Sequence, residues 1–122
     1  MANKPVILVV DDDQPILTLM KTILREFGFE ARLASSGTAA VSAARAERPD
    51  LVLLDKNMPG MSMEEIISAL RDVSEVPILI LSGEPISPVE INQYGANGAV
   101  QKPFDVPQLV EQIRSFVGVA RR

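Results

Sequence analysis

Three aspartates stand at the ends of two apolar runs, where carboxylate chemistry is open to them. Asp11 and Asp12 follow the run Val6–Val10, and Asp55 follows Leu51–Leu54. Carboxylates that share one site repel one another, so at least one tends to take up a proton unless a cation is near. Mg²⁺ suits such a site, because it binds through a few carboxylates and keeps waters for phosphate. A carboxylate kept ionised there can attack a phosphoryl group and form an acyl phosphate, and we assign that role to Asp55.

A second cation for this site comes from the chain itself. Lys102 ends the last short strand pattern, which begins at Ala99. The three negative charges of the carboxylates are then nearly balanced by two positive charges from the metal and one from lysine. A metal and a lysine that hold the phosphoryl oxygens provide most of what phosphoryl transfer requires of a protein.

The elements that must position these residues alternate between strand and helix. Strand patterns cover residues 5–10, 29–34, 50–55, 76–81 and 99–102. The intervening helices begin at residues that can cap them, namely Asp13, Ser36, Ser62, Ser87 and Asp105. Such alternation predicts an α/β fold with a parallel sheet and helices on both faces. We expect a single domain, residues 1–122, with a flavodoxin-like three-layer sandwich and five strands in the order 2-1-3-4-5.

This strand order brings the two carboxylate-bearing strand ends together, because strands 1 and 3 become neighbours. Two helices are expected to pack on the sheet through faces that include Phe27 in the first and Phe116 in the last. The fourth helix is expected to be short, since Gly95 and Gly98 stop it.

Composition narrows the function classes. The chain has 122 residues, a net charge of −4, no Cys and no His, so disulfides, thiol nucleophiles, Ser-His catalysis and imidazole ligands are excluded. An acidic domain without a basic face is a poor candidate for binding nucleic acid directly. No apolar run has the length of a membrane span or the pattern of a signal peptide, and we expect a cytoplasmic protein without membrane contact.

Four sequence segments together resemble the receiver domains of two-component response regulators, the chemotaxis regulator among them. They are Val10-Asp11-Asp12, Asp55-Lys-Asn-Met-Pro-Gly60, Ser82-Gly83 and Lys102-Pro103-Phe104. The resemblance covers essentially the whole chain, in order and with matching spacing. It implies a regulatory phosphoacceptor rather than an enzyme in its own right, one that assists its own phosphorylation and dephosphorylation.

The resemblance implies a role for each matched residue. Asp55 would take phosphate from a histidine kinase or phosphotransfer protein. Asp12 would bind Mg²⁺ directly and Asp11 through water, with the backbone carbonyl of Asn57 as a further ligand. Lys102 would pair with the phosphoryl group. The switch hydroxyl would be that of Ser82, and the Lys102-Pro103 bond resembles the family's cis peptide.

Three positions depart from the family pattern. Ala99 stands where an aromatic switch residue is usual, so the coupled movement of hydroxyl and ring cannot operate in its usual form. The segment from Ser82 to Gly95 is about two residues shorter than the family pattern, which makes the mode of partner binding hard to transfer. Ser62-Met63 replaces the usual Asp-Gly, with a small expected effect because Ser62 still caps the helix.

Asn57 and Glu84 carry a further expectation. They lie two residues after the phosphoacceptor and the switch hydroxyl, and would flank the path of the water that hydrolyses the acyl phosphate. The pair matches the chemotaxis regulator of the flagellar motor, which implies a short-lived phosphoryl group. A downstream protein partner or a missing output domain is expected as the recipient of the signal, and a homodimer stays open.

Three other functions remain to be weighed. A scaffold that keeps the fold without switching is favoured by Ala99. A Mg²⁺-dependent phosphatase of the haloacid dehalogenase type also uses an Asp nucleophile, but it needs a second Asp where this chain has Asn57. A flavodoxin needs a phosphate-binding loop after the first strand, where Asp11-Asp12-Asp13 would repel the phosphate.

Overall fold

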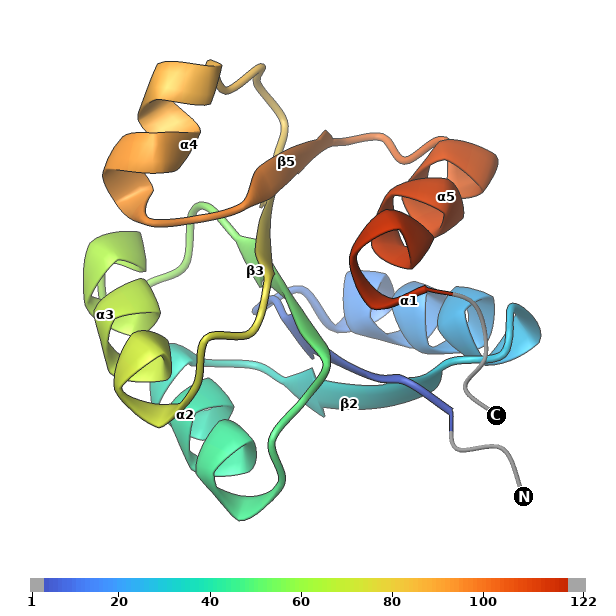
Figure 1. Ribbon diagram of the computed structural model, residues 1–122, viewed down its shortest axis with the longest axis horizontal. Coiled ribbons are helices and arrows are strands. Elements are labelled where there is room, and N and C mark those ends of the chain that lie inside the picture. Colours follow the sequence, from blue (N-terminus) through green and yellow to red (C-terminus); the bar gives the residue numbers. More distant parts are fainter. Residues whose placement is uncertain (1–3, 119–122) are drawn as a thin grey trace.

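A five-stranded parallel sheet runs through the molecule, with helices on both of its faces (Figure 1). The computed structural model describes residues 4–118. The strands are β1 (Val6–Val10), β2 (Glu30–Ala34), β3 (Leu51–Asp55), β4 (Ile78–Ser82) and β5 (Gly98–Gln101). The helices are α1 (Gln14–Glu26), α2 (Gly37–Ala46), α3 (Met63–Val73), α4 (Pro88–Tyr94) and α5 (Val106–Val117). The strand order β2-β1-β3-β4-β5 confirms the predicted flavodoxin-like sandwich.

The sheet separates two hydrophobic cores. Side chains alternate along each strand, so Val9 of β1 faces α1 and α5 whereas its neighbour Val10 faces α2 and α3. Every residue of β3 and of β4 is buried, which explains why their sequences are nearly continuous apolar runs. The two cores hold the central strand ends firmly in place.

All five predicted helix caps are confirmed. In each case the side chain of the capping residue accepts a hydrogen bond from a backbone N–H in the first turn, and the residues are Asp13, Ser36, Ser62, Ser87 and Asp105. Both predicted capping boxes, at α3 and α4, are complete. Because helices of a parallel sheet start at the carboxyl ends of the strands, these caps fix the turns at one edge of the sheet.

Two aromatic residues lie elsewhere than predicted. Phe27 and Phe116 were expected on buried helix faces, but 38% and 40% of their surfaces are exposed. Phe27 follows the last residue of α1 and leaves the helical conformation, so the helix period does not reach it. Phe116 belongs to the last turn of α5, beyond Leu109, Val110 and Ile113, which pack on the sheet.

Helix α4 is short, as predicted, with seven residues, none of them buried. Arg71 of α3 holds its carboxyl end. The guanidinium donates to the Val76 carbonyl (2.5 Å), the Gly95 carbonyl (3.1 Å) and Asn97 Oδ1 (2.8 Å). The polar contacts of Arg71 thus add to the partial packing of Tyr94 against the core at this end of α4.

Helix α2 approaches α3 closely at Gly37. A Cβ at this glycine would lie 2.7 Å from Ile66 Cγ1 and 3.0 Å from Met61 Sδ. We predict that Gly37→Ala lowers the free energy of unfolding. Overpacking costs about 1–3 kcal/mol, and the better helix propensity of alanine offsets part of that cost. Urea unfolding measures the change. Gly83→Ala is the matched control, because no atom lies within 4 Å of its added Cβ; equal effects of the two substitutions would contradict the packing interpretation.

The helices of residues 4–118 are all too short or too polar to cross a bilayer. The longest, α1, has 13 residues, against roughly 20 for a membrane-spanning helix.

Candidate functional site

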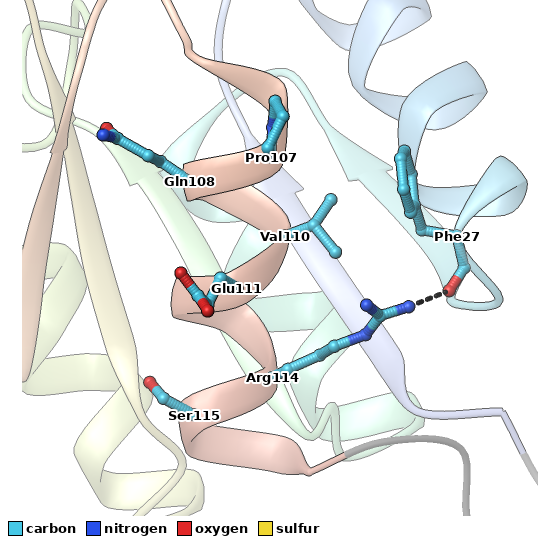
Figure 2. Close-up of a pocket in the computed structure, with 7 residues that line it drawn as sticks. All are labelled: Phe27, Pro107, Gln108, Val110, Glu111, Arg114 and Ser115. Atoms are coloured by element: carbon cyan, nitrogen blue, oxygen red, sulfur yellow. Dashed lines mark hydrogen bonds between the residues drawn. The ribbon is translucent and has the colours of Figure 1, made fainter.

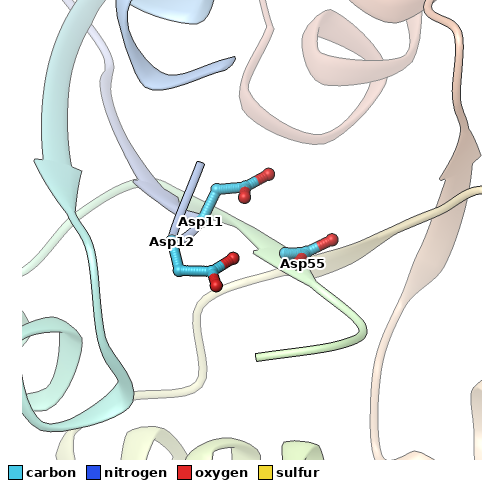
Figure 3. A group of neighbouring side chains, drawn as sticks. All are labelled: Asp11, Asp12 and Asp55. Carbon is cyan, nitrogen blue, oxygen red and sulfur yellow. The ribbon is translucent and has the colours of Figure 1, made fainter. Parts of the chain in front are cut away.

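Strand pairing places the three candidate carboxylates together. Val10 pairs with Leu54 in the β1–β3 register, so the residues that follow them, Asp11 and Asp55, leave the sheet side by side. Asp11 is 1% exposed and Asp55 8%, whereas Asp12 is exposed. One carboxylate oxygen from each of the three lies within 4.8 Å of the others, and Figure 3 shows the three side chains close together at the ends of β1 and β3; we call this group the acidic crevice.

Lys102 reaches this crevice from the loop between β5 and α5. Its Nζ donates to Asp55 Oδ1 at 3.0 Å and to Asp11 Oδ2 at 3.2 Å. Its backbone N–H donates to the Ser82 carbonyl at 2.8 Å, so the lysine is also held by the neighbouring strand. The Lys102-Pro103 peptide is cis, as the sequence pattern predicted.

A contact that sequence reasoning missed holds Asp11 on its other side. The backbone N–H of Asp13 donates to Asp11 Oδ1 at 3.0 Å. An aspartate that accepts from the backbone two residues later is a known turn motif, and this spacing was the available signal. Both oxygens of Asp11 thus have donors within the protein.

Burial and charge shift the pKa values of the central pair. Desolvation raises the pKa of Asp55 above 3.8, and the charges of Asp11 and Asp12 add to it, although Lys102 opposes the shift. Burial also disfavours the charged form of Lys102, but its hydrogen bonds and attraction to Asp55 and Asp11 outweigh this and raise its pKa above 10.5. The crevice therefore carries excess negative charge, despite the lysine.

Ser82 lies at the end of β4, between β3, which carries Asp55, and β5, which Lys102 follows. It is 3% exposed, and its Oγ accepts from the backbone N–H of Glu84 at 3.1 Å. Among residues 4–118 its hydroxyl makes no hydrogen bond to a side chain of the acidic crevice. In this state it is bound to its own loop.

The other two predicted residues lie outside the cluster. Asn57 is exposed in the loop after β3 and lines a hollow of about 480 Å³ together with Lys56 and Tyr94. Glu84 is exposed two residues after Ser82. The structure thus brings Asp11, Asp12, Asp55 and Lys102 together, whereas Asn57 and Glu84 are exposed in the loops that follow β3 and β4.

Ala99 leaves a hollow beside the Ser82 loop. The hollow has a volume of about 180 Å³ and lies between β5 and the segment Glu84–Ile86. Its lining comes from Ala99 and the two residues after it and from Glu84, Pro85 and Ile86 of the loop.

The crevice matches the requirements of a hard divalent cation. All of its ligand atoms are carboxylate oxygens from Asp11, Asp12 and Asp55, the ligand type that Mg²⁺ prefers. The raised pKa of Asp55 also favours a bound cation, because a cation would stabilise the carboxylate charge that burial disfavours. The geometry fits a metal ion among the three carboxylates.

A sequence model of the response regulator receiver domain matches residues 7–114, most of the chain. The chain belongs to this family. The crevice of this receiver domain lies where sequence reasoning placed it, and the regulatory family assignment from the four motifs is confirmed.

Curated relatives extend beyond this receiver domain. The DNA-binding response regulator MtrA of Mycobacterium tuberculosis is 39% identical over 111 residues, which are 89% of this chain and 49% of that protein. The transcriptional regulatory protein PrrA of the same species is 34% identical over 94% of this chain and 51% of its own length. The receiver domain thus spans about half the length of these relatives.

Solved structures agree in fold. Chemotaxis protein CheY4 of Vibrio cholerae superposes with a TM-score of 0.86 at 31% identity, over 93% of this chain and 99% of that one. The receiver domain of the sensor histidine kinase PA1611 of Pseudomonas aeruginosa superposes with a TM-score of 0.85 at 26% identity, over 95% and 99%. That structure has a magnesium ion coordinated in its active site cleft.

Proposed function

We propose that Asp55 accepts a phosphoryl group from a histidine kinase or phosphotransfer protein. The observation that carries the proposal is the position of Lys102, whose Nζ lies 3.0 Å from Asp55 Oδ1 and 3.2 Å from Asp11 Oδ2. A lysine that joins two buried strand-end carboxylates is placed to hold the oxygens of an incoming phosphoryl group.

Mg²⁺ is the proposed cofactor of this step. Asp12 and Asp55 would bind it directly, together with the backbone carbonyl of Asn57. Asp11 would act through water, which agrees with its two oxygens having donors in Lys102 and Asp13. When bound, Mg²⁺ would neutralise carboxylate charge and bind phosphoryl oxygens. The magnesium in the PA1611 receiver domain supports this choice.

The transfer itself begins from the ionised carboxylate of Asp55. An Asp55 oxygen attacks phosphorus, the bond from phosphorus to the donor atom breaks, and that atom leaves with the electron pair. Lys102 moves from its carboxylate partners to the new phosphoryl oxygens. The chain thereby assists its own phosphorylation, and in this sense it is a regulatory domain with limited catalytic power.

The readout is proposed to depend on Ser82 and its loop. On phosphorylation the hydroxyl would exchange the Glu84 backbone N–H for the phosphoryl group. This movement would draw the segment Glu84–Ile86 toward the crevice and change the hollow at Ala99. Without an aromatic ring in that hollow, the signal must pass through the loop.

The site is proposed to serve a cytoplasmic signalling protein. Since the curated relatives are about twice the length of the matched region, a downstream partner or an output domain would read the phosphorylated state. Direct binding of this domain to nucleic acid or to a membrane forms no part of the proposal.

Incubation with acetyl phosphate or phosphoramidate tests the proposal. Wild-type protein with Mg²⁺ should gain the mass of one phosphoryl group, and the same sample in EDTA should not. Intact mass spectrometry measures the gain. An unchanged mass with both donors would favour a non-switching scaffold, and turnover of a generic phosphate ester would favour a phosphatase.

The phosphoryl group is predicted to be short-lived. Asn57 and Glu84 are both exposed, and they lie two residues after Asp55 and Ser82, where they would flank the path of the water that hydrolyses the acyl phosphate. Decay of the phosphorylated protein in Mg²⁺, followed by intact mass, should be complete well within an hour. A lifetime of many hours would contradict this expectation, and Glu84→Ala tests whether that side chain contributes.

A further inference from the structure

A hollow at the amino ends of β1 and β2 carries several positive charges. Its volume is about 290 Å³, and it is lined by Lys4, by Lys21 and Arg25 of α1, and by residues 29–31 at the start of β2. The acidic crevice lies at the carboxyl ends of β1 and β3, so this hollow is at the opposite edge of the sheet (Figure 1). We call it the basic hollow.

The positive charge of the basic hollow is not balanced by the residues around it. Lys4, Lys21 and Arg25 are exposed, and among the described residues none of their side chains forms an ion pair or donates a hydrogen bond. The carboxylate of Glu30, which also lines the hollow, accepts from Arg32 at 3.1 and 3.2 Å instead. Positive charge is therefore concentrated here, in a chain whose net charge is −4.

The fold itself gains little from this arrangement. Lys21 and Arg25 are four residues apart in α1, a spacing at which like charges repel one another on a helix surface. The helix dipole favours Arg25 in the last turn, but it does not explain Lys4, which belongs to the segment before β1. Two separate segments thus bring cations to one place without an internal partner for them.

Arg114 brings a fourth positive charge close to the basic hollow. Figure 2 shows it reaching from α5 to the end of α1, where its Nη2 donates to the Phe27 carbonyl at 3.4 Å. Its guanidinium carbon lies 5.9 Å from the centroid of the Phe29 ring, which lines the hollow. A carbonyl and an aromatic ring do not cancel the charge of the guanidinium, so Arg114 adds to the positive potential there.

We infer that the basic hollow binds a small anion with two or more linked phosphoryl groups, of the chemical class of pyrophosphate. Three lining cations match about three negative charges, whereas a single phosphate group carries about two at most. The planar guanidinium of Arg25 can hold two phosphate oxygens at once, and the ammonium groups of Lys4 and Lys21 act as point charges beside it. The volume lies near the lower end of the range of about 300–1,000 Å³ for small-molecule pockets, which suits a ligand of this size.

This binding does not rest on the phosphorylation of Asp55. The lining residues belong to the segment before β1, to α1 and to the start of β2, and neither the acidic crevice nor the Ser82 loop contributes one. Asp55→Asn protein should therefore bind pyrophosphate as the wild type does, and failure of the proposed function would leave this inference standing.

Isothermal titration calorimetry with pyrophosphate as the probe tests the inference. The buffer is freed of metal, because a divalent cation would bind both pyrophosphate and the acidic crevice. Wild-type protein should bind, and Lys21→Gln and Arg25→Gln should each raise the dissociation constant about tenfold through the loss of one charge-assisted contact. Both variants keep a polar side chain with good helix propensity at an exposed position, so the fold should be retained.

Arg45→Gln is the matched control, since it removes the same charge from an exposed position in the last turn of α2, on the other face of the sheet. It should bind pyrophosphate as the wild type does. Amide NMR spectra of the wild type should shift at the end of α1 and the start of β2 when pyrophosphate is added. The inference would be overturned by a wild type that binds no pyrophosphate at millimolar concentration, by shifts confined to the acidic crevice, by an unchanged dissociation constant in either variant, or by an equal loss in Arg45→Gln.

Discussion

Asp55→Asn is expected to abolish phosphoryl uptake completely. The amide keeps the shape of the side chain but has no anionic oxygen to attack phosphorus. Wild type and variant are incubated with acetyl phosphate and Mg²⁺ and compared by intact mass, with peptide mapping of the modified residue. A gain of mass in the variant, or mapping of the wild-type group to another residue, would place the phosphoacceptor elsewhere.

The acidic segment that opens α1 supplies a matched control. Asp13 is next to Asp12 but caps the helix with its side chain, as Asn also can. Asp13→Asn should therefore retain uptake and thermal stability, while removing the same unit of charge from the same neighbourhood. Equal losses in Asp13→Asn and Asp55→Asn would mean that overall charge, rather than a nucleophile, controls the reaction.

Asp55→Asn should stabilise the protein when no metal is present. The pKa of Asp55 is raised in the folded state, chiefly by burial and further by Asp11 and Asp12. Because the folded protein holds the Asp55 proton more tightly than the unfolded chain, protonation of Asp55 stabilises the folded state. This stabilisation is complete below about pH 3.8 and is lost as pH rises through the folded-state pKa. In EDTA, Asp55→Asn should thus be more stable than wild type at pH 7, with a difference that disappears toward pH 4.

Mg²⁺ should reverse this order by relieving the charge of the crevice. At about 100 times its dissociation constant, a ligand that binds only the folded state adds about 2.7 kcal/mol. The gain should be large in wild type and small in Asp55→Asn. Urea unfolding at several pH values, with EDTA or Mg²⁺, measures both effects. Equal stabilisation of the two proteins by Mg²⁺ would show that the ion binds elsewhere.

Much of the architecture follows from local sequence signals. The apolar run before Asp55 and the capping boxes at Ser62 and Ser87 depend on neighbouring residues alone, and the structure agrees with each. The meeting of Asp11 with Asp55 follows from strand order, because a parallel sheet brings particular strand ends together. Local pattern and topology were sufficient for the crevice.

What escaped prediction depends on packing between distant segments. Phe27 has an apolar side chain at helical spacing, yet its exposure depends on where α1 ends relative to α5. The contact of Arg114 with Phe27 joins residues 87 positions apart. The close approach at Gly37 likewise depends on where Met61 and Ile66 lie. Periodicity identifies the face of a helix, but it does not say what that face meets.

The shallow seating of α4 has a consequence for how the molecule can change over evolutionary time. Since none of its residues is buried, local unfolding of α4 removes little of the apolar contact that holds the domain together. Its sequence can therefore vary at small cost to the fold. The sequence of α4 can thus change without disturbing the buried strands that carry Asp11 and Asp55 to the acidic crevice.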